Sequence, residues 1–212
     1  MADLKTTITW YDKNSEFYKQ QALRNIPLAQ INDFVRLLPK KGKVLDVGCG
    51  SGRDTFELAK KGIKVIGLDL SAGMVECAKK TYPQLEFIKG NFLNLPFEKE
   101  AFDGVWAHAA LVHLESVEDV KKALKEFGRV LKPNGVIHVK VKANLNDIKF
   151  ETIKDLTGSG ERFMQYFTQD EIVGYLQEIG FTVIKNYQYP VSNPKKYLKP
   201  VEWIVCLGKK VS

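Results

Sequence analysis

The chain has 212 residues, of which 44% are hydrophobic and 27% charged, and its formal net charge is +7 at pH 7. These values are those of an ordinary globular domain and exclude a disordered, collagen-like or disulfide-rich chain. Cys49, Cys77 and Cys206 lack C-x-x-C spacing, so neither a disulfide framework nor a metal site is expected.

No segment has the apolar length of a signal peptide or a membrane span, which predicts a cytoplasmic protein without membrane contact. The positive charge favours a polyanionic partner such as RNA only if it is clustered. The lysines instead form dispersed pairs, typical of solvated helix ends. These pairs are Lys40 and Lys41, Lys60 and Lys61, Lys79 and Lys80, Lys121 and Lys122, Lys195 and Lys196, and Lys209 and Lys210. Nucleic acid is therefore the less favoured partner, and we expect a monomer or a homodimer.

We expect a single domain over residues 1–212, with N-terminal helices over residues 1–42 that cover a cleft and an α/β core over residues 43–212. Residues 15–38 have a helical pattern that Pro27 interrupts, which predicts two short helices before the first strand. Beyond them, short runs rich in Val, Ile and Leu alternate with amphipathic segments, as in βαβ units.

The predicted strands cover residues 43–47, 64–69, 85–89, 102–108, 136–141, 181–187 and 203–207. Helices are predicted over residues 55–61, 72–81 and 117–131, and from Thr168 to Gly180. Ser71 and Ser116 are predicted N-caps, and Thr168 with Glu171 forms a capping box. Pro190, Pro194 and Pro200 mark a loop between the last two strands. Because buried parallel strands need crossover helices, the pattern predicts a doubly wound, mostly parallel sheet.

A glycine-rich loop joins the first strand to the next helix. Gly48, Gly50 and Gly52 allow a tight turn and a close approach to a ligand, and the helix that follows offers free N–H groups. The spacing is D-x-G-x-G-x-G, with Arg53 where the dinucleotide pattern has its third glycine. The Walker A pattern is also absent from the sequence, so nicotinamide, flavin and Walker-type phosphate binding are all less favoured.

Polar side chains follow the next two strands. Asp69 ends the second strand beside the glycine loop, where a carboxylate can accept both hydroxyls of a ribose. The alternative is a turn residue before Ser71. Asn91 follows the third strand and can bond an adenine edge, while Phe92 and Met74 can pack against the ring or simply belong to the core.

Together with residues 65–71, 90–96, 102–114 and 129–135, these features resemble the class I methyltransferases that depend on S-adenosylmethionine (SAM), in particular the small single-domain type. The resemblance implies a Rossmann-like sheet of seven strands in the order 3-2-1-4-5-7-6, with the last strand antiparallel. It also implies SAM as the cofactor. Asn91 departs from the family pattern, in which Asp is commoner.

The resemblance further implies that Asp46 orients the methionine amino group, that residues 48–52 pack against the methionine, and that Asp69 holds the ribose. Asn91 and Phe92 would flank the adenine. The residues predicted to bind the cofactor are Tyr11, Asp46, Gly48, Cys49, Gly50, Gly52, Arg53, Asp69, Leu70, Met74, Asn91, Phe92 and Ala107.

Methyl transfer gains mainly from the alignment of nucleophile, methyl group and sulfur in a dry pocket. An acceptor that carries a proton still benefits from a base, and His108 ends the fourth strand at the ligand edge. His108 is therefore the candidate catalytic residue, and the alternative is a histidine that only lines the pocket. His113 is expected to brace a turn or contact substrate, and His138 is expected to be structural.

In the fifth strand, His138, Lys140 and Lys142 alternate with apolar residues, so one face of it is polar. Lys142 lies nearest the carboxyl edge and is expected to meet an anionic acceptor, whereas Lys140 is expected to extend past a helix to water. Residues 143–160 are polar and turn-rich, and a lid is predicted over about residues 143–167. The resemblance implies that this loop and the N-terminal helix cover the acceptor pocket. The predicted substrate-side residues are Trp10, His113, Lys142, Arg162 and Tyr166, and surface packing is the alternative for them.

The favoured function is methyl transfer to an O, N or S atom of a small molecule, because the chain has little beyond the catalytic core. The alternatives are an RNA methyltransferase, with tRNA as one substrate considered, and a SAM-binding protein without turnover.

Overall fold

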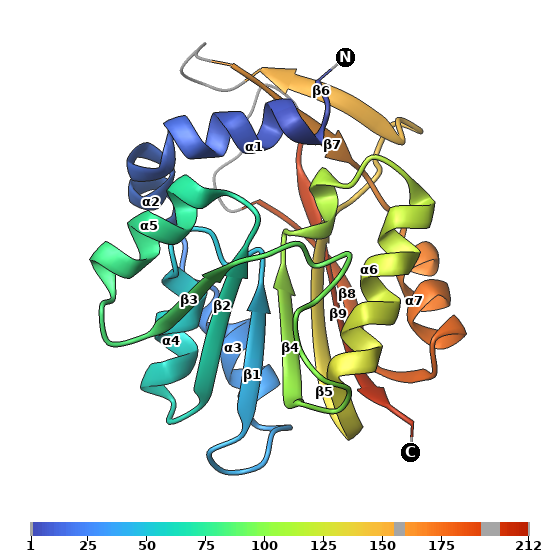
Figure 1. Cartoon of the computed structure of the whole chain (residues 1–212). Helices are drawn as coiled ribbons and strands as arrows, with labels where there is room; N and C mark the ends of the chain where they lie inside the picture. The colour runs from blue at the N-terminus through green and yellow to red at the C-terminus, as the bar shows by residue number, and fades with distance from the viewer. Residues whose placement is uncertain (1, 155–159, 192–199, 212) are drawn as a thin grey trace.

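The computed structural model describes residues 2–154, 160–191 and 200–211. Within them, seven strands form one sheet in the order β3-β2-β1-β4-β5-β9-β8 (Figure 1). The strands are β1 (Lys43–Val47), β2 (Lys64–Asp69), β3 (Glu86–Lys89), β4 (Phe102–His108), β5 (Leu131–Lys142), β8 (Phe181–Pro190) and β9 (Glu202–Lys210). The first five are parallel, and β9 runs antiparallel between β5 and β8. The predicted order is confirmed, because β6 and β7 belong to a separate hairpin.

Helices cover both faces of the sheet. They are α3 (Leu28–Val35), α4 (Arg53–Lys60), α5 (Ala72–Thr81), α6 (Val117–Val130) and α7 (Gln169–Glu178). Side chains of α6 and α7 share the largest apolar cluster with Ile137, Val139 and Val141 of β5. Side chains of α3 and α4 pack on the opposite face around Trp106. Burial on both faces explains the near-continuous apolar runs of the central strands.

The helix starts follow the local chemistry that the sequence predicts. The Ser71 hydroxyl accepts from the Met74 N–H, and the Ser116 hydroxyl accepts from the Asp119 N–H. Thr168 and Glu171 form a reciprocal capping box. The strands β8 and β9 are longer than predicted, because their pairing continues over polar residues. Of the prolines expected to mark the loop between them, Pro194 lies outside the described residues, as do Lys195 and Lys196.

Two helices lie over the carboxyl ends of the strands. The second, α2 (Ser15–Leu23), lies in the predicted helical segment, whereas the first, α1 (Leu4–Lys13), lies within residues 1–42, where N-terminal helices were expected without bounds for this one. Asp3 caps α1 by accepting from the Thr6 N–H, and Thr7 and Trp10 are its buried residues. Because only these two residues of α1 are buried and most of the others are polar, the sequence alone does not define the bounds of this helix. Figure 1 shows α1 crossing above β1, β2 and β4.

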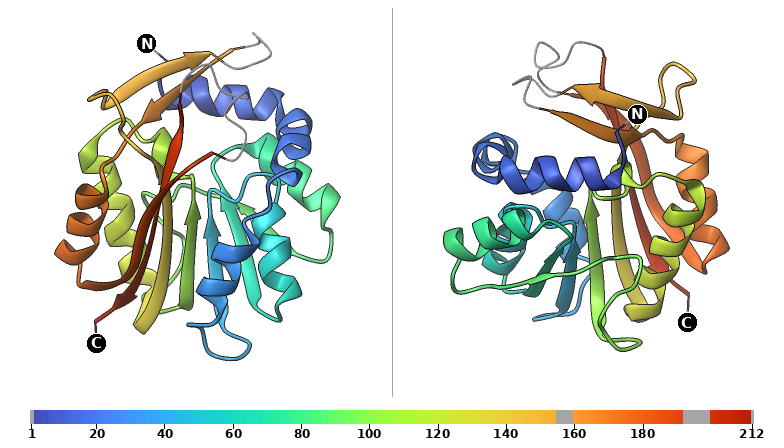
Figure 2. Two further views of the ribbon diagram at one scale, coloured as in Figure 1. Left: turned by 180° about the vertical axis from the view of Figure 1, so that it is seen from behind. Right: turned by 45° about the horizontal axis from the view of Figure 1, so that its top comes forward.

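The segment 143–167 contains a hairpin of β6 (Phe150–Lys154) and β7 (Glu161–Gln165), where the sequence suggested a loop. The two strands pair because β7 buries Phe163 and Met164 beneath it, and the Phe163 N–H donates to Thr7 Oγ1 of α1 at 2.9 Å. Both views in Figure 2 place this hairpin beyond α1, at the outer side of the sheet's carboxyl edge.

None of the helices in the described ranges combines the length and the apolar character that a membrane crossing requires. The same ranges hold no group of three or more His, Cys, Asp or Glu side chains placed to bind a metal ion.

Candidate active site

Two cavities lie at the carboxyl ends of the parallel strands, under α1 and α2. The large cavity has a volume of about 390 Å³, and the small cavity has a volume of about 70 Å³. Both are lined by Tyr18, Gly48, Gly50, His108 and Ala109. The glycine loop and the end of β4 therefore form the boundary at which the two cavities meet.

The glycine loop has a backbone that excludes side chains. Gly48 has a φ of +68°, and a Cβ there would lie 2.6 Å from the Cβ of Ala110. Gly52 has a φ of +83°, and a Cβ there would lie 2.7 Å from the ring of Phe87. Gly52 thus allows close packing of α4 against β3, whereas Gly48 and Gly50 line both cavities.

Asp69 holds the glycine loop and also lines the small cavity. Its Oδ2 accepts from the Gly50 N–H at 2.8 Å, and its Oδ1 accepts from the Ser71 N–H at 2.9 Å. Burial raises the pKa of this carboxyl group. Each oxygen retains a second lone pair for a ligand hydroxyl. From the sequence, Asp69 was either a turn residue or a residue facing a ligand. In the structure it stabilises the turn and also lines the small cavity.

The remaining wall of the small cavity is mostly apolar. Leu70, Met74 and Phe92 line it, together with Asn91. The Asn91 Oδ1 accepts from the Leu93 N–H at 2.9 Å, which leaves the amide NH2 group as a donor toward a ligand.

The large cavity has a buried acidic pair on the side of the glycine loop. Arg53 binds Asp54 through two hydrogen bonds, of 2.6 Å and 2.9 Å, and also donates to the carbonyls of Ala22 and Asn25 in and after α2. Arg53 therefore joins α2 to the start of α4. Asp46 is 2% exposed and accepts from Thr55 Oγ1 at 2.6 Å. Burial and the charge of Asp54 raise the pKa of Asp46.

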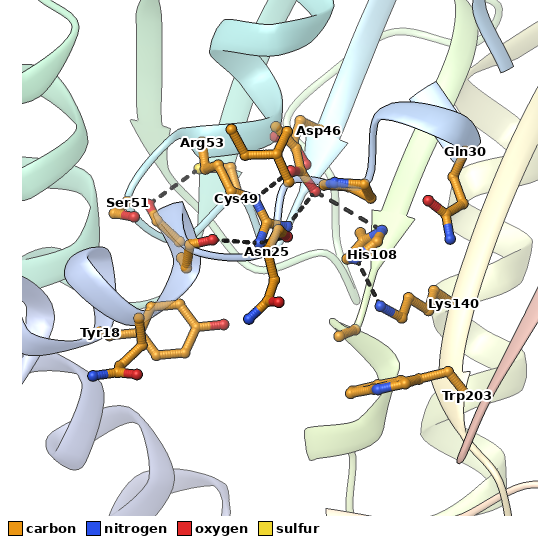
Figure 3. Close-up of a pocket in the computed structure, with 18 of the residues that line it drawn as sticks. Tyr18, Asn25, Gln30, Asp46, Cys49, Ser51, Arg53, His108, Lys140 and Trp203 are labelled. Atoms are coloured by element: carbon orange, nitrogen blue, oxygen red, sulfur yellow. Dashed lines mark hydrogen bonds and ion pairs between the residues drawn. The ribbon is translucent and has the colours of Figure 1, made fainter. Parts of the chain in front are cut away.

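On the opposite side of the large cavity, His108 and Lys140 are hydrogen-bonded (Figure 3). The Lys140 Nζ lies 3.1 Å from His108 Nε2, and the Asp54 Oδ2 lies 3.9 Å from His108 Nδ1. Burial, with the charges of Lys140 and Arg53, lowers the pKa of His108 well below its usual value, so the ring is neutral. Nε2 is then the acceptor and Nδ1 carries the proton.

Lys140 lines the large cavity, so the prediction that it extends to water is wrong. Its Nζ lies 4.3 Å from the centroid of the Trp203 ring. Burial lowers the pKa of Lys140 to about 7. His138, two residues earlier on the same face, is fully buried and stacks on Trp106 at 3.7 Å, in agreement with the structural role expected for it.

A hydrogen-bonded cluster of Tyr11, His113 and Arg162, which we call the clasp, connects α1, the turn after β4 and the hairpin. The His113 Nδ1 lies 3.0 Å from the Phe163 carbonyl oxygen and therefore carries the proton, so its Nε2 accepts from the Tyr11 hydroxyl at 2.9 Å. Arg162 Nη1 donates to the same hydroxyl at 3.2 Å. Burial lowers the pKa of His113 to about 3, which keeps its ring neutral. The clasp holds α1 over the small cavity.

Most of the predicted site residues line one or both cavities. These are Tyr11, Asp46, Gly48, Cys49, Gly50, Arg53, Asp69, Leu70, Met74, Asn91, Phe92, His108 and His113. Six others do not: Trp10, Gly52, Ala107, Lys142, Arg162 and Tyr166. Ala107 is fully buried core, and Lys142 lies 5.8 Å from the Tyr166 ring under the hairpin. The Arg162 guanidinium stacks over Trp10 at 4.4 Å.

Several residues of the large cavity were missed by the sequence reasoning, namely Tyr18, Asn25, Gln30, Asp54, Tyr189 and Trp203. One available signal is the direction of β9. In an antiparallel strand the first residues, not the last, lie at the ligand edge, which places Trp203 opposite both Lys142 and Tyr189.

Comparison with known proteins agrees with this geometry. Residues 45–139 match a family model described as a methyltransferase domain. A demethylmenaquinone methyltransferase of Chlorobaculum tepidum is 39% identical over 101 residues, which cover 47% of this chain and 40% of that protein. The chain therefore spans less than half the length of this curated relative.

Two solved structures share the fold. A SAM-dependent methyltransferase of Methanosarcina mazei has a TM-score of 0.76 at 21% identity, covering 84% of this chain and 96% of the other. The 1,6-didemethyltoxoflavin-N1-methyltransferase of Burkholderia thailandensis has a TM-score of 0.74 at 19% identity, covering 99% and 87%. Residues 45–139 are therefore similar to a methyltransferase domain, and the chain has the same Rossmann-like fold as these two solved structures.

Proposed function

We propose that the chain is an enzyme that binds SAM and transfers its methyl group to a small-molecule acceptor. The observation that carries this proposal is the junction of the two cavities at Gly48 and Gly50, with the Gly50 N–H fixed by Asp69. A ligand that crosses this junction places its ends in different cavities, as a methyl donor facing an acceptor requires.

The side chains that line the small cavity suit an adenosyl group, which would extend from it along the glycine loop. Asp69 offers lone pairs to a ribose diol, Met74 and Phe92 offer apolar contact to an adenine face, and Asn91 offers an amide donor. Among the described residues that line it there is no Lys or Arg, so nothing there would balance the charge of a pyrophosphate. SAM, when bound, supplies an electrophilic methyl group on a sulfonium.

The methionine end of SAM would lie along the glycine loop, where the large cavity begins. Asp46 lines this part of the large cavity and is the proposed partner of the amino group. Arg53 is already bonded to Asp54 and to two backbone carbonyls, so we assign it the role of positioning α2 over the loop.

The rest of the large cavity is the proposed acceptor site. Its volume of about 390 Å³ is near the lower end of the roughly 300–1,000 Å³ of small-molecule pockets. Tyr18 and Trp203 lie on opposite sides of it (Figure 3), which favours a flat acceptor. The related proteins named above act, by their names, on a demethylmenaquinone and on 1,6-didemethyltoxoflavin, which are also small molecules. His108 lies at the junction and is the proposed catalytic residue from the sequence.

The distribution of lysine pairs also favours a small acceptor over RNA. Lys40 and Lys41 lie shortly before β1, and Lys60 and Lys61 lie shortly before β2, so both pairs are at the amino edge of the sheet, opposite the cavities. Lys209 and Lys210 end the antiparallel β9 at the same amino edge. A basic surface around the site would require the reverse arrangement.

The experiment that tests the proposal measures release of S-adenosylhomocysteine with a panel of phenols, quinols, enols, N-heterocycles, thiols and tRNA. We expect release with at least one small acceptor and none with tRNA. The Asp69→Ala variant, assayed at limiting SAM, is the control with weakened cofactor binding. If SAM binds tightly but no acceptor leads to release of S-adenosylhomocysteine, the chain is instead a SAM-binding protein without turnover.

A further inference from the structure

Lys140 occupies an unusual place in the proposed acceptor site. It projects from the fifth strand of a buried sheet, yet its Nζ reaches the wall of the large cavity. That nitrogen is hydrogen-bonded to His108 Nε2 at 3.1 Å. Two aromatic rings, those of Trp203 at 4.3 Å and Tyr189 at 5.8 Å, complete its surroundings.

No carboxylate of a described residue forms an ion pair with Lys140. The charged groups that face it are Arg53 and Asp54 from α4, and Asp54 is already bonded to Arg53 and to the Trp106 Nε1–H. The titratable neighbours His108 of β4 and Tyr189 of β8 are neutral in this setting, because burial lowers the pKa of the former and raises that of the latter. A buried cation without a counter-ion is costly, and an anionic ligand would offset that cost.

The hydrogen bond to His108 fixes where the amine points. A neutral imidazole whose Nε2 accepts from Lys140 does not use that nitrogen to take a proton from an acceptor. His108 is in that case a positioning residue, and the group that faces the acceptor is the amine of Lys140.

Resting on the function proposed above, we propose that Lys140 is the residue that recognises and activates the acceptor, and that the acceptor is a flat molecule carrying an acidic hydroxyl, a phenol or an enol. The ring would lie between Tyr18 and Trp203, and its oxygen would face the Lys140 Nζ. In the neutral form, Lys140 takes the hydroxyl proton, so that an amine and a phenol become an ammonium and a phenolate. The phenolate is the nucleophile for the methyl group, and the ammonium afterwards releases its proton to solvent.

The pKa of about 7 that burial gives Lys140 matches this use, because a base works best when its pKa lies near the working pH. An ordinary lysine would remain an ammonium throughout the neutral range.

The test uses 4-nitrophenol, whose phenolate absorbs visible light while its neutral form does not. The probe is titrated against the full chain saturated with S-adenosylhomocysteine, and the absorbance of the bound probe is followed with pH. We expect the apparent pKa of bound 4-nitrophenol to lie below that of the free probe. We expect 4-nitroanisole, which lacks the hydroxyl, to bind at least about 10-fold more weakly, the loss typical of a charged hydrogen bond.

Three variants separate the roles of the side chain. Lys140→Met should abolish the phenolate signal, Lys140→Arg should retain it because its charge still holds the anion, and Lys132→Met, on the same strand but at the other end of the sheet, should behave as the unaltered chain. Thermal melting followed by circular dichroism checks that each variant is folded. Calorimetry should show the same S-adenosylhomocysteine affinity in all of them.

Two outcomes would overturn the inference. In the first, the chain binds S-adenosylhomocysteine but takes 4-nitrophenol only in its neutral form or not at all. In the second, Lys140→Met weakens S-adenosylhomocysteine and leaves the probe unaffected, which would assign Lys140 to the carboxylate of the methyl donor. A different result would contradict the proposed function instead of this inference. In that case the phenolate binds at Lys140, but the chain binds neither SAM nor S-adenosylhomocysteine.

Discussion

The large and small cavities share a boundary at the glycine loop but are lined by different kinds of side chain. The small cavity is lined mainly by apolar side chains, with Asp69 as its only carboxylate among the described residues. The large cavity is lined by Asp46, Arg53, Asp54 and Lys140, within a wall that includes three aromatic rings. One cavity therefore provides shape and a single anchoring carboxylate, and the other provides charge.

The difference indicates a division of tasks. A methyl donor that is the same in every turnover can be held by a mainly apolar pocket, for which the clasp and α1 provide the cover. The proposed acceptor, a phenol or an enol, must be ionised and aligned, which is the task of charges whose environment shifts their pKa values. Changes on the two sides should consequently affect different measured quantities.

The largest effect is expected from His108, which stands at the boundary of the cavities. His108→Ala should lower turnover by about 100-fold or more, the size of a lost acid–base contribution, while SAM affinity measured by calorimetry stays nearly unchanged. His108→Gln supplies an amide oxygen that can still accept from Lys140 and should recover part of the rate. Recovery would support a positioning role, and a glutamine variant as slow as the alanine variant would indicate that the ring itself transfers the proton.

On the side of the small cavity, Asp69→Ala should weaken SAM by about 1.5 to 3 kcal/mol, the range for losing a charged hydrogen-bond partner. The loss includes the bond that fixes the Gly50 N–H. Asp103→Ala is the control, since it removes a strand carboxylate at the opposite edge of the sheet, where Asp103 binds Lys132. If the folded Asp69→Ala chain binds SAM with unaltered affinity, Asp69 is only a turn residue and does not contribute to SAM binding.

The stability of the chain should report the burial of Lys140. The pKa of Lys140 is about 7 in the fold against 10.5 in the unfolded chain, so between these values the unfolded chain binds more protons and stability rises with pH. Lys140→Met removes this contribution. Its gain in free energy of unfolding, from urea titrations, should be greatest near neutral pH and fade as the pH approaches 10.5. A gain independent of pH would show that Lys140 keeps an ordinary pKa.

The smallest effect is expected at the clasp. Tyr11→Phe removes the hydroxyl shared by His113 and Arg162 and should weaken SAM by about 0.5 to 1.5 kcal/mol, mainly through faster dissociation. Tyr175→Phe on α7 removes a hydroxyl remote from the site and serves as the control. Equal dissociation rates in both variants, measured by stopped flow, would show that the clasp does not restrain α1.

The two cavities also differ in how far the sequence predicts them. The small cavity follows from short contiguous motifs, because each strand end delivers its next residues to one edge of a parallel sheet, as Asp69 and Asn91 illustrate. The large cavity combines Tyr18, Lys140 and Trp203, which are far apart in the chain, and no local pattern joins them.

The prediction of which β5 lysine, Lys140 or Lys142, lines the large cavity shows why the sequence is not sufficient. Both lie on the polar face of β5, and alternation alone favours the lysine nearer the edge. Lys142 pairs directly opposite Trp203 beneath the hairpin, whereas Lys140, one step deeper on that face, reaches the cavity. The hairpin and the bounds of α1 were not predicted for a related reason, since the burial of both depends on contacts with each other rather than on their own sequence patterns.

The central claim, that the small cavity and the glycine loop hold a methyl donor, is tested most directly by calorimetric titration of the chain with SAM, S-adenosylhomocysteine and NAD under the same conditions. The account predicts that both adenosyl ligands bind and that NAD binds far more weakly, because Asp69 suits a ribose and no cation in the small cavity would offset a pyrophosphate. Tight binding of NAD with no heat from SAM or S-adenosylhomocysteine would contradict it.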